Sequence, residues 1–253
     1  MKLSEQVITW TRDTFAAMGR DTAVLGISGG KDSAVVAAIL AHALGAENVF
    51  GVMMPNGEQR DIADSRQVIA ALGINGLLVN IAEQYEAAVR PALLVSPATH
   101  CPVSAVALLP GEEAKINVAP RLRMTKLYEI AQTLAAHGRK ACVVGTGNRA
   151  ENYVGYCTKW GDMACDLNPI KGLWVHEVLQ VGDELGYFPH IVHKAPDDGL
   201  SGKTDEERLG FSYDAVYQFV EGGGDIPDEV RTMIEARHRV NRHKQNPIPY
   251  FTR

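Results

Sequence analysis

The residues best suited to chemistry form one glycine-rich segment, Gly26-Ile27-Ser28-Gly29-Gly30-Lys31-Asp32-Ser33. Small residues allow backbone N–H groups to close around phosphate oxygens, and a following helix adds its partial positive charge. The segment is not a Walker A loop, because Leu25 stands where that pattern needs its first Gly and Asp32 follows Lys31. A tight turn whose glycines serve only geometry is the alternative. Two serines and a carboxylate exceed what a turn needs, so we expect a phosphate-binding loop.

A second glycine-rich segment lies later in the chain and reads Gly145-Thr146-Gly147-Asn148-Arg149-Ala150. It matches the Gly-x-Gly-x-x-Ala pattern that binds dinucleotides after a strand. Such a site also needs a second strand that ends in Asp or Glu about 20 residues on. Residues 152–162 show no clear strand, so a nicotinamide-dependent oxidoreductase is a weak alternative.

These segments need a scaffold that brings them to one edge of a sheet. Apolar runs without polar alternation indicate buried strands at residues 22–27, 48–54, 76–81 and 141–146. Helical patterns separate them at residues 33–44, 61–72 and 121–137, and Asp61 is placed to cap the second helix. Strands alternating with helices predict an α/β fold with a doubly wound parallel sheet. The pattern is helical from residue 174 onward, at residues 176–185, 213–220 and 227–244, so we expect a single domain over residues 1–253 with a helical C-terminal part.

Composition narrows the class of protein. The chain has 253 residues, of which 46% are hydrophobic and 22% charged, and its net charge of −5 argues against a nucleic-acid partner. The N-terminus shows no signal peptide, and residues 91–111 lack Asp, Glu, Lys and Arg but contain four prolines. We expect that stretch to be a loop or buried connection and not a membrane span. The four cysteines form no Cys-x-x-Cys pair, which is typical of reduced thiols in a cytoplasmic protein.

The loop resembles the pyrophosphatase loop (PP-loop) of enzymes that cleave ATP to AMP and diphosphate. Further segments resemble the NAD synthetase family in particular, in the right order and from about Leu25 to the C-terminus. They are Met54-Pro55 with Gln59 and Asp61, residues 117–124 (NVAPRLRM), 145–151 (GTGNRAE), 155–162 (GYCTKWGD), 166–169 (DLNP), 203–206 (KTDE) with Leu209-Gly210, and His243-Lys244.

The resemblance implies an adenine nucleotide alpha-hydrolase-like fold and a ligase that forms a C–N bond. The nicotinic-acid carboxylate of deamido-NAD would attack the α-phosphate of ATP, diphosphate would leave, and ammonia would displace AMP to give NAD+. No protein nucleophile is needed, so catalysis would consist mostly of positioning and charge stabilisation. The cofactor would be Mg²⁺, which prefers hard oxygen ligands and few of them from protein.

The resemblance also implies a role for particular residues. Asp32 and Glu151 would hold Mg²⁺, and each follows a predicted strand, so the two could converge on one crevice; a capping carboxylate is the alternative for each. ATP would be held by the backbone of Gly26 to Ser33 and by Thr146. Deamido-NAD would be contacted by Arg121, Lys159, Asp166, His243 and Lys244, each of which could otherwise be a solvated surface residue.

One family feature is missing. Many members place a lysine that reaches the ATP phosphates at the position of Val175, with Lys171 slightly earlier and His176 next to it in this chain. We expect a different phosphate contact and not lost activity. Lys203 is the first candidate for the missing charge and Lys194 the second.

Two expectations concern assembly. Residues 90–116 do not align with confidence, and their apolar, proline-rich composition suits either a loop covered by a partner subunit or a lid over the active site. The resemblance implies a homodimer. Glutamine-dependent relatives carry an extra glutaminase domain, and the synthetase segments begin near residue 25, so we expect no such domain and free ammonia as the nitrogen donor.

Two other functions stay open. The first is another AMP-forming ATP pyrophosphatase such as a tRNA thiolase, which would call for a catalytic cysteine pair and a basic tRNA surface. The second is a catalytically impaired nucleotide-binding relative, which only Val175 supports. Intact Asp32 and Glu151 argue against it.

Overall fold

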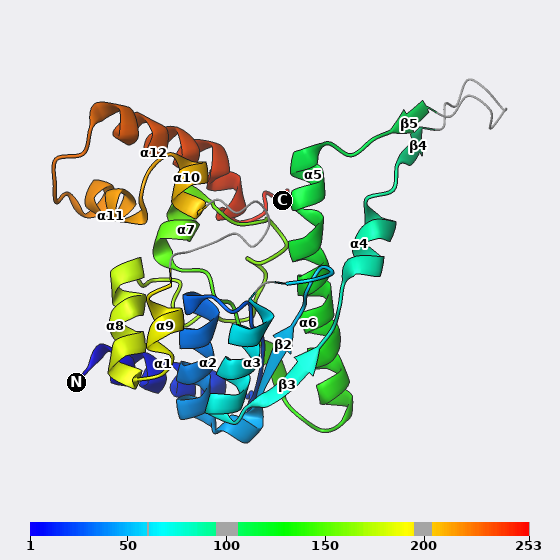
Figure 1. The fold of residues 1–253 in the computed structure, drawn as a ribbon, viewed down its shortest axis with the longest axis vertical. Coiled ribbons are helices and arrows are strands. Elements are labelled where there is room, and N and C mark those ends of the chain that lie inside the picture. Colours follow the sequence, from blue (N-terminus) through cyan, green and yellow to red (C-terminus); the bar gives the residue numbers. More distant parts are fainter. Residues whose placement is uncertain (60, 95–105, 195–203, 253) are drawn as a thin grey trace.

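The computed structural model describes residues 1–59, 61–94, 106–194 and 204–252. A four-stranded parallel sheet lies at its centre in the order β3-β2-β1-β6 (Figure 1). The strands are β1 (Thr22–Gly26), β2 (Val49–Met53), β3 (Asn75–Leu78) and β6 (Ala141–Val143). In the register of the sheet, Ala23 of β1 lies between Val49 and Cys142. The predicted doubly wound parallel sheet is confirmed.

The absence of polar alternation in β1 follows from burial on both faces. Ala23 and Leu25 point into one hydrophobic cluster and Val24 into another, and all three are fully buried. The first cluster lies beneath α1 (Leu3–Ala17), α2 (Lys31–Leu44), α3 (Ile62–Leu72), α8 (Val175–Leu185) and α9 (Pro189–Val192). The second lies beneath α6 (Val118–Ala136) on the opposite face (Figure 1).

A third hydrophobic cluster holds the C-terminal helices together, two of which, over residues 213–221 and 228–241, were predicted from the sequence. It joins α7 (Arg149–Val154), α10 (Asp205–Leu209), α11 (Tyr213–Glu221) and α12 (Asp228–Asn241). Trp174, directly before α8, is 3% exposed and lies in the same cluster. A short 3-10 helix, Arg242–Lys244, follows α12. These helices gather at the end of the sheet where β1 and β6 finish (Figure 1).

The stretch expected to be a loop between residues 91 and 111 contains secondary structure at its ends. After α4 (Ala82–Ala88), β4 (Ala92–Leu94) pairs antiparallel with β5 (Val106–Leu108), and α5 (Glu112–Ile116) leads into α6. The prediction of a loop is therefore wrong at these two segments, because the two strands pair with each other along one edge. The hairpin projects away from the sheet (Figure 1), and Leu108 and Leu109 are strongly exposed. Within the described residues, no helix has the length and apolar character needed to cross a bilayer.

Candidate active site

The glycine-rich loop lies where β1 ends at Gly26 and α2 begins at Lys31. Its serines brace it from within: the Ser28 N–H donates to Ser33 Oγ at 3.2 Å, and the Gly30 N–H donates to Ser28 Oγ at 3.2 Å. Gly29 has a φ of +85°, and a Cβ there would lie 2.8 Å from the carbonyl oxygen of Asp61. Only glycine fits this position, which allows the turn to pass closely beneath the start of α3.

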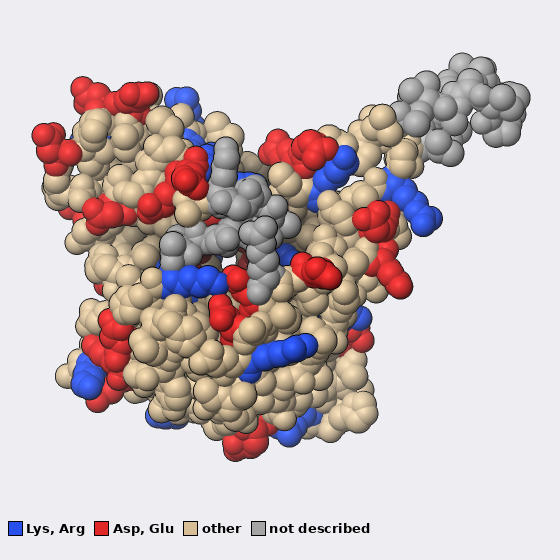
Figure 2. All heavy atoms as spheres, viewed as in Figure 1, with Lys and Arg blue, Asp and Glu red and all other residues tan. Residues whose placement is uncertain are grey.

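A pocket opens beside this loop and draws its walls from three parts of the chain. The β1–α2 loop and the first turn of α2 provide Ser28, Gly30, Asp32 and Ser33. The β6–α7 connection and α7 provide Thr146, Gly147, Glu151 and Asn152. The stretch between α7 and α8 provides Tyr156, Cys157, Asp162, Met163, Cys165, Asn168 and Lys171. Because the carboxyl ends of parallel strands share one edge of the sheet, β1 and β6 deliver the first two sets side by side. In Figure 2, acidic side chains lie beside the central hollow of the face shown.

The structure brings together six of the residues expected to bind ATP or metal. Ser28, Gly30, Asp32, Ser33, Thr146 and Glu151 all line the pocket. The remaining members of the loop, Gly26, Ile27, Gly29 and Lys31, are not part of its lining. Ile27 is 2% exposed and packs in the core, and Lys31 is 7% exposed. The side chains of Ile27 and Lys31 therefore anchor the loop, and ATP binding by the backbone of this segment stays a prediction.

Asn148 links the two carboxylates expected to hold metal. It is fully buried and caps α7 by accepting from the Glu151 N–H at 3.1 Å, while its own N–H donates to Glu151 Oε2 at 2.9 Å. Its side-chain amide also reaches Asp32 Oδ1 at 3.4 Å. The Asn-x-x-Glu spacing of a capping box was visible in the sequence, but the contact with Asp32 depends on the fold.

The charges in this part of the pocket are strongly coupled. Burial and the neighbouring Asp32 carboxylate raise the pKa of Glu151 to about 8. Lys31 Nζ lies 3.0 Å from Asp32 Oδ2. Burial acts to lower the pKa of Lys31, but Asp32 and Glu151 outweigh it and raise that pKa. Lys31 is therefore a charged, buried counter-ion of Asp32.

The chemistry of this donor set fits Mg²⁺. Asp32 and Glu151 supply hard carboxyl oxygens to the pocket, and burial together with the neighbouring Asp32 disfavours a second negative charge there, which a bound cation would offset. Among the described residues, no group of three His, Cys, Asp or Glu side chains could by itself hold a metal ion. Mg²⁺ in phosphoryl-transfer sites needs only one or two carboxylates, because phosphate and water complete its shell.

Three of the residues expected to contact deamido-NAD form a second, exposed group, which we call the cation cluster: Arg121, Lys159 and His243. Arg121 Nε donates to the Lys159 carbonyl oxygen at 3.3 Å, and Lys159 Nζ lies 3.4 Å from His243 Nδ1. The loop that carries Lys159 is fixed by the Thr158 N–H, which donates to Asp162 Oδ1 at 2.8 Å. Asp162 also lines the pocket, so the cation cluster and the pocket share this loop.

The other two residues expected to bind deamido-NAD make internal contacts instead. Lys244 Nζ donates to the carbonyl oxygens of Gly155 and Cys157, at 2.6 and 2.7 Å. Asp166 accepts from the Val143 N–H at 2.7 Å and from the Tyr128 hydroxyl at 3.2 Å. Both residues therefore stabilise the segments that frame the site, and the structure does not group either with the cation cluster.

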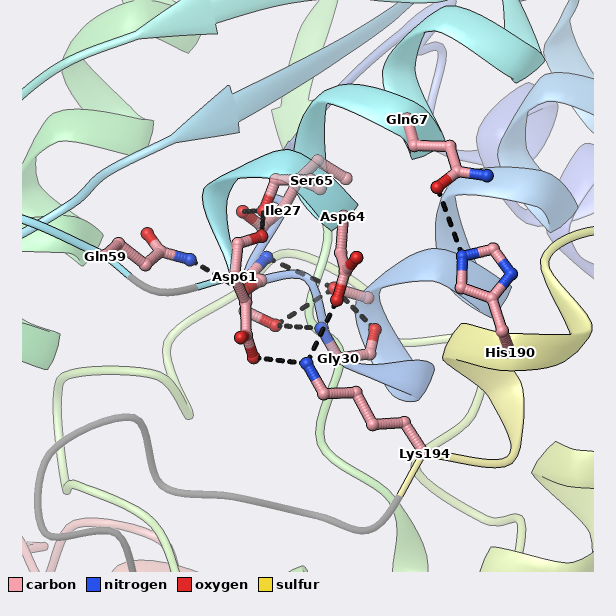
Figure 3. A network of polar contacts seen from close by, with 11 residues as sticks. Ile27, Gly30, Gln59, Asp61, Asp64, Ser65, Gln67, His190 and Lys194 are labelled. Atoms are coloured by element: carbon pink, nitrogen blue, oxygen red, sulfur yellow. Dashed lines mark hydrogen bonds and ion pairs between the residues drawn. The ribbon is translucent and has the colours of Figure 1, made fainter.

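Figure 3 shows a polar network behind the phosphate-binding loop. Lys194 Nζ lies 2.6 Å from Asp61 Oδ2 and 3.0 Å from Asp64 Oδ2. Asp61 stands at the N-cap position of α3 as predicted, but its side chain makes no capping hydrogen bond. The prediction of a capping carboxylate is wrong, because the carboxylate pairs with Lys194. Lys194 is thus engaged, and Lys203, the first candidate for the missing phosphate contact, lies outside the described residues.

The same network holds the loop in place from outside. Gln59 Nε2 donates to the Ser28 carbonyl oxygen at 2.8 Å, and Ser65 Oγ donates to the Ile27 carbonyl oxygen at 3.2 Å (Figure 3). These contacts satisfy backbone oxygens that the sharp turn leaves without partners. The loop is therefore braced by side chains from within and by Gln59 and Ser65 from outside.

The pocket cysteines are poor nucleophiles. Burial raises the pKa of Cys157 to about 12, and it also raises the pKa of Cys165. Both thiols are free and stay protonated near neutral pH. The catalytic cysteine pair that tRNA thiolation would need is not formed by these two residues.

Comparison with known proteins places the chain within one family. The family described as NAD synthase matches residues 3–248. An NH(3)-dependent NAD(+) synthetase of Alkaliphilus metalliredigens is 35% identical over 252 residues, which cover 97% of this chain and 96% of that protein. The solved structure of an NMN synthetase from Francisella tularensis has a TM-score of 0.83 at 29% identity and covers 98% of this chain and 96% of that one. An NH3-dependent NAD synthetase from Campylobacter jejuni shares the fold, with a TM-score of 0.76 at 22% identity and coverage of 99% and 98%.

Proposed function

Because this chain belongs to the NAD synthase family, we propose that it is an ammonia-dependent NAD+ synthetase. It converts ATP, deamido-NAD and ammonia into AMP, diphosphate and NAD+. The observation that carries this proposal is the pocket in which the phosphate-binding loop meets Asp32 and Glu151, with Lys159 of the cation cluster on a loop that also lines this pocket.

The reaction proceeds by two displacements on the substrates. A carboxylate oxygen of deamido-NAD forms a bond to the α-phosphorus of ATP, and the bond to diphosphate breaks. Ammonia then adds its electron pair to the acyl carbon, AMP leaves with the former carboxylate oxygen, and the nitrogen loses a proton to give the amide. The thiols of Cys157 and Cys165 stay protonated and are poor nucleophiles, so the substrate carboxylate is the nucleophile of the first step.

The chain contributes position and charge. The Gly30 backbone and the Ser28 and Ser33 hydroxyls line the pocket at the N-terminus of α2, where the helix dipole stabilises phosphate charge. Asp32 and Glu151 are the residues that would hold Mg²⁺, which when bound neutralises phosphate charge as diphosphate departs. Asn148 keeps the two carboxylates at a fixed separation, since it contacts both.

The cation cluster suits the phosphate groups of the second substrate. Arg121 and Lys159 present positive charge without a carboxylate partner among the described residues, and His243 lies beside the Lys159 ammonium. The loop of Lys159 continues to Asp162, which lines the pocket. If the phosphate groups of deamido-NAD bind at the cation cluster, the nicotinate carboxylate of the same molecule can extend toward the pocket. The same residues would serve a mononucleotide, since its phosphate carries the same charge.

A smaller substrate is a second candidate. The likeness to the NMN synthetase structure, with its TM-score of 0.83, favours nicotinate mononucleotide, whose amidation gives NMN. The sequence relatives named NH(3)-dependent NAD(+) synthetase favour the dinucleotide. Both substrates contain the same reacting carboxylate, so the pocket chemistry does not change between them.

One assay tests the proposal. The protein is incubated with ATP, Mg²⁺, ammonium and either deamido-NAD or nicotinate mononucleotide, and AMP and the amidated product are measured. We expect AMP and NAD+ in equal amounts with deamido-NAD. AMP formed without either acid substrate would refute the proposal, and preferential NMN formation would assign the smaller substrate.

The proposal includes a homodimer, free ammonia as nitrogen donor and a cytoplasmic site of action. Leu108 and Leu109, exposed at the base of the projecting hairpin, support the homodimer. The similarity to NH(3)-dependent NAD(+) synthetases supports free ammonia. Light scattering of the purified chain gives its oligomeric state. A monomer at micromolar concentration would contradict this part of the proposal.

A further inference from the structure

The pocket offers few positive charges to a polyphosphate. Carboxyl groups of Asp32, Glu151 and Asp162 line it, and Lys171 carries the only basic side chain among its described lining residues. Bound ATP adds several negative charges. A site of this kind needs cations directed at the phosphates, and Mg²⁺ on Asp32 and Glu151 supplies charge at one side only.

The backbone fixes Lys171 at the pocket wall. Asn168 Nδ2 donates to the Gly147 carbonyl oxygen at 2.9 Å, and the Ile170 N–H donates to Asn168 Oδ1 at 3.0 Å. Ile170 is fully buried, and the turn closes where the Leu173 N–H donates to its carbonyl oxygen at 2.9 Å. Lys171 follows this anchored residue and is exposed, so its side chain extends from a rigid turn.

The ammonium of Lys171 is free to act. Within the described part of the chain, no ion pair or hydrogen bond engages it. Burial raises the pKa values of Cys157 and Cys165, and the charge of Lys171 acts in the opposite direction on both. Lys171 therefore lies near these two pocket residues.

Other lysines near the loop are already committed. Lys31 is buried against Asp32, and Lys194 pairs with Asp61 and Asp64. Val175, where the family resemblance places a phosphate-contacting lysine, packs half-buried against the C-terminal hydrophobic cluster and does not line the pocket. Lys171 is therefore the described residue best placed to supply that charge.

We propose that Lys171 binds the phosphate chain of ATP and the departing diphosphate, in place of the lysine that the family resemblance puts at Val175. The inference rests on the proposed function for its catalytic part, since only an AMP-forming reaction releases diphosphate here. An ammonium carries three donors and no acceptor, so it can follow phosphate oxygens as the bond to the α-phosphorus breaks. It thereby stabilises charge that develops on the leaving group.

The test compares Lys171→Met with Lys140→Met, in the full chain. Lys140 is exposed and directly precedes β6, at the edge of the sheet opposite the pocket, so its substitution makes the same charge change away from the site. Titration calorimetry measures binding of Mg·ATP and of magnesium diphosphate. Loss of one charge-assisted contact should weaken both about 10- to 100-fold in Lys171→Met and less than twofold in Lys140→Met.

Two further measurements separate contact from structure. Lys171→Arg should retain most of the affinity, and thermal unfolding without ligand should be alike in all three variants. In steady-state kinetics, the KM for ATP should rise in Lys171→Met while the KM for deamido-NAD stays unchanged.

The outcomes distinguish this inference from the proposed function. Unchanged ATP and diphosphate affinities in Lys171→Met would overturn the inference while an active wild-type chain upholds the function. A wild-type chain that binds ATP through Lys171 but forms no amide would overturn the function alone. A wild-type chain that binds no ATP would overturn both.

Discussion

Replacing Glu151 by glutamine should stabilise the metal-free protein while removing its ability to bind metal. Glutamine is nearly isosteric and can still accept from the Asn148 N–H, a bond of 2.9 Å in the wild type. It carries no charge beside Asp32. The substitution thus keeps the capping box of α7 and removes only the buried ionisable group.

The size of the effect follows from the pKa. Glu151 is raised from 4.5 to about 8 in the folded chain by burial and by Asp32. The folded protein therefore holds a proton that the unfolded chain releases, and stability falls as pH rises between these two values. At pH 7 this costs the wild type about 3 kcal/mol at most. Glu151→Gln should recover about 1 to 3 kcal/mol, which is about 3 to 10 °C in the unfolding midpoint of a chain of this size.

Thermal unfolding in EDTA at pH 5 and at pH 8 measures this gain, which should be larger at the higher pH. Addition of Mg·ATP should raise the midpoint of the wild type and leave that of Glu151→Gln nearly unchanged, because metal binding requires the carboxylate. Glu177→Gln is the matched control. Glu177 occupies the same capping-box position in α8, accepts from the Trp174 N–H at 2.7 Å, and lies outside the pocket.

Two results would refute this reasoning. A lower unfolding midpoint for Glu151→Gln in EDTA would mean that the buried carboxylate stabilises the fold. Equal stabilisation of both proteins by Mg·ATP would mean that Glu151 is not a metal ligand.

Three other substitutions have distinct expected effects. Asn148→Ala should lower the free energy of unfolding by about 1 to 2 kcal/mol through loss of the α7 cap, with partial recovery in Asn148→Ser; denaturant unfolding that shows no loss would contradict this. Lys159→Met should raise the KM for deamido-NAD about 10-fold by removing one phosphate contact, while the KM for ATP stays unchanged. If steady-state kinetics show an equal rise of both KM values, Lys159 has a structural role instead. Gly145→Ala would place a Cβ 2.6 Å from Cys165 Sγ and should lower the free energy of unfolding by about 1 to 3 kcal/mol. Calorimetry should show that adding Cys165→Ala restores most of this stability. If the double variant is no more stable, another contact causes the clash.

The core of the fold was predictable because burial on both faces makes the strands continuously apolar. Residues 22–27 are such a run, and β1 occupies Thr22–Gly26. The first helix was not predicted. Its inward face includes Val7, Thr11 and Phe15. Thr11 is polar and therefore interrupts the apolar spacing, but its hydroxyl donates to the Val7 carbonyl oxygen. Only the folded helix shows that this hydroxyl is satisfied and can be buried.

The positions of site residues that directly follow a strand could be predicted from the sequence. The hydrogen-bond and ion-pair partners of the site residues could not. Asp32 and Glu151 follow β1 and β6, and neighbouring parallel strands bring them to one pocket as expected. The partners of Lys194, Lys244 and Asp166 could not be read from the sequence. Each is fixed by contacts across the fold with residues far away in the chain, such as Asp61 for Lys194.

The strand order also sets a sequence of events during synthesis. β1 can pair with β2 early, but its other edge pairs with β6, where Thr22 meets Ala141. Until β6 has emerged from the ribosome, one edge of the central strand has open hydrogen-bonding groups and can capture another chain. Closing so long a connection is slow compared with local pairing. The nascent chain therefore carries its phosphate-binding loop well before it carries the carboxylate of Glu151, and the pocket is complete only after β6, the fourth strand, and α7 have been made.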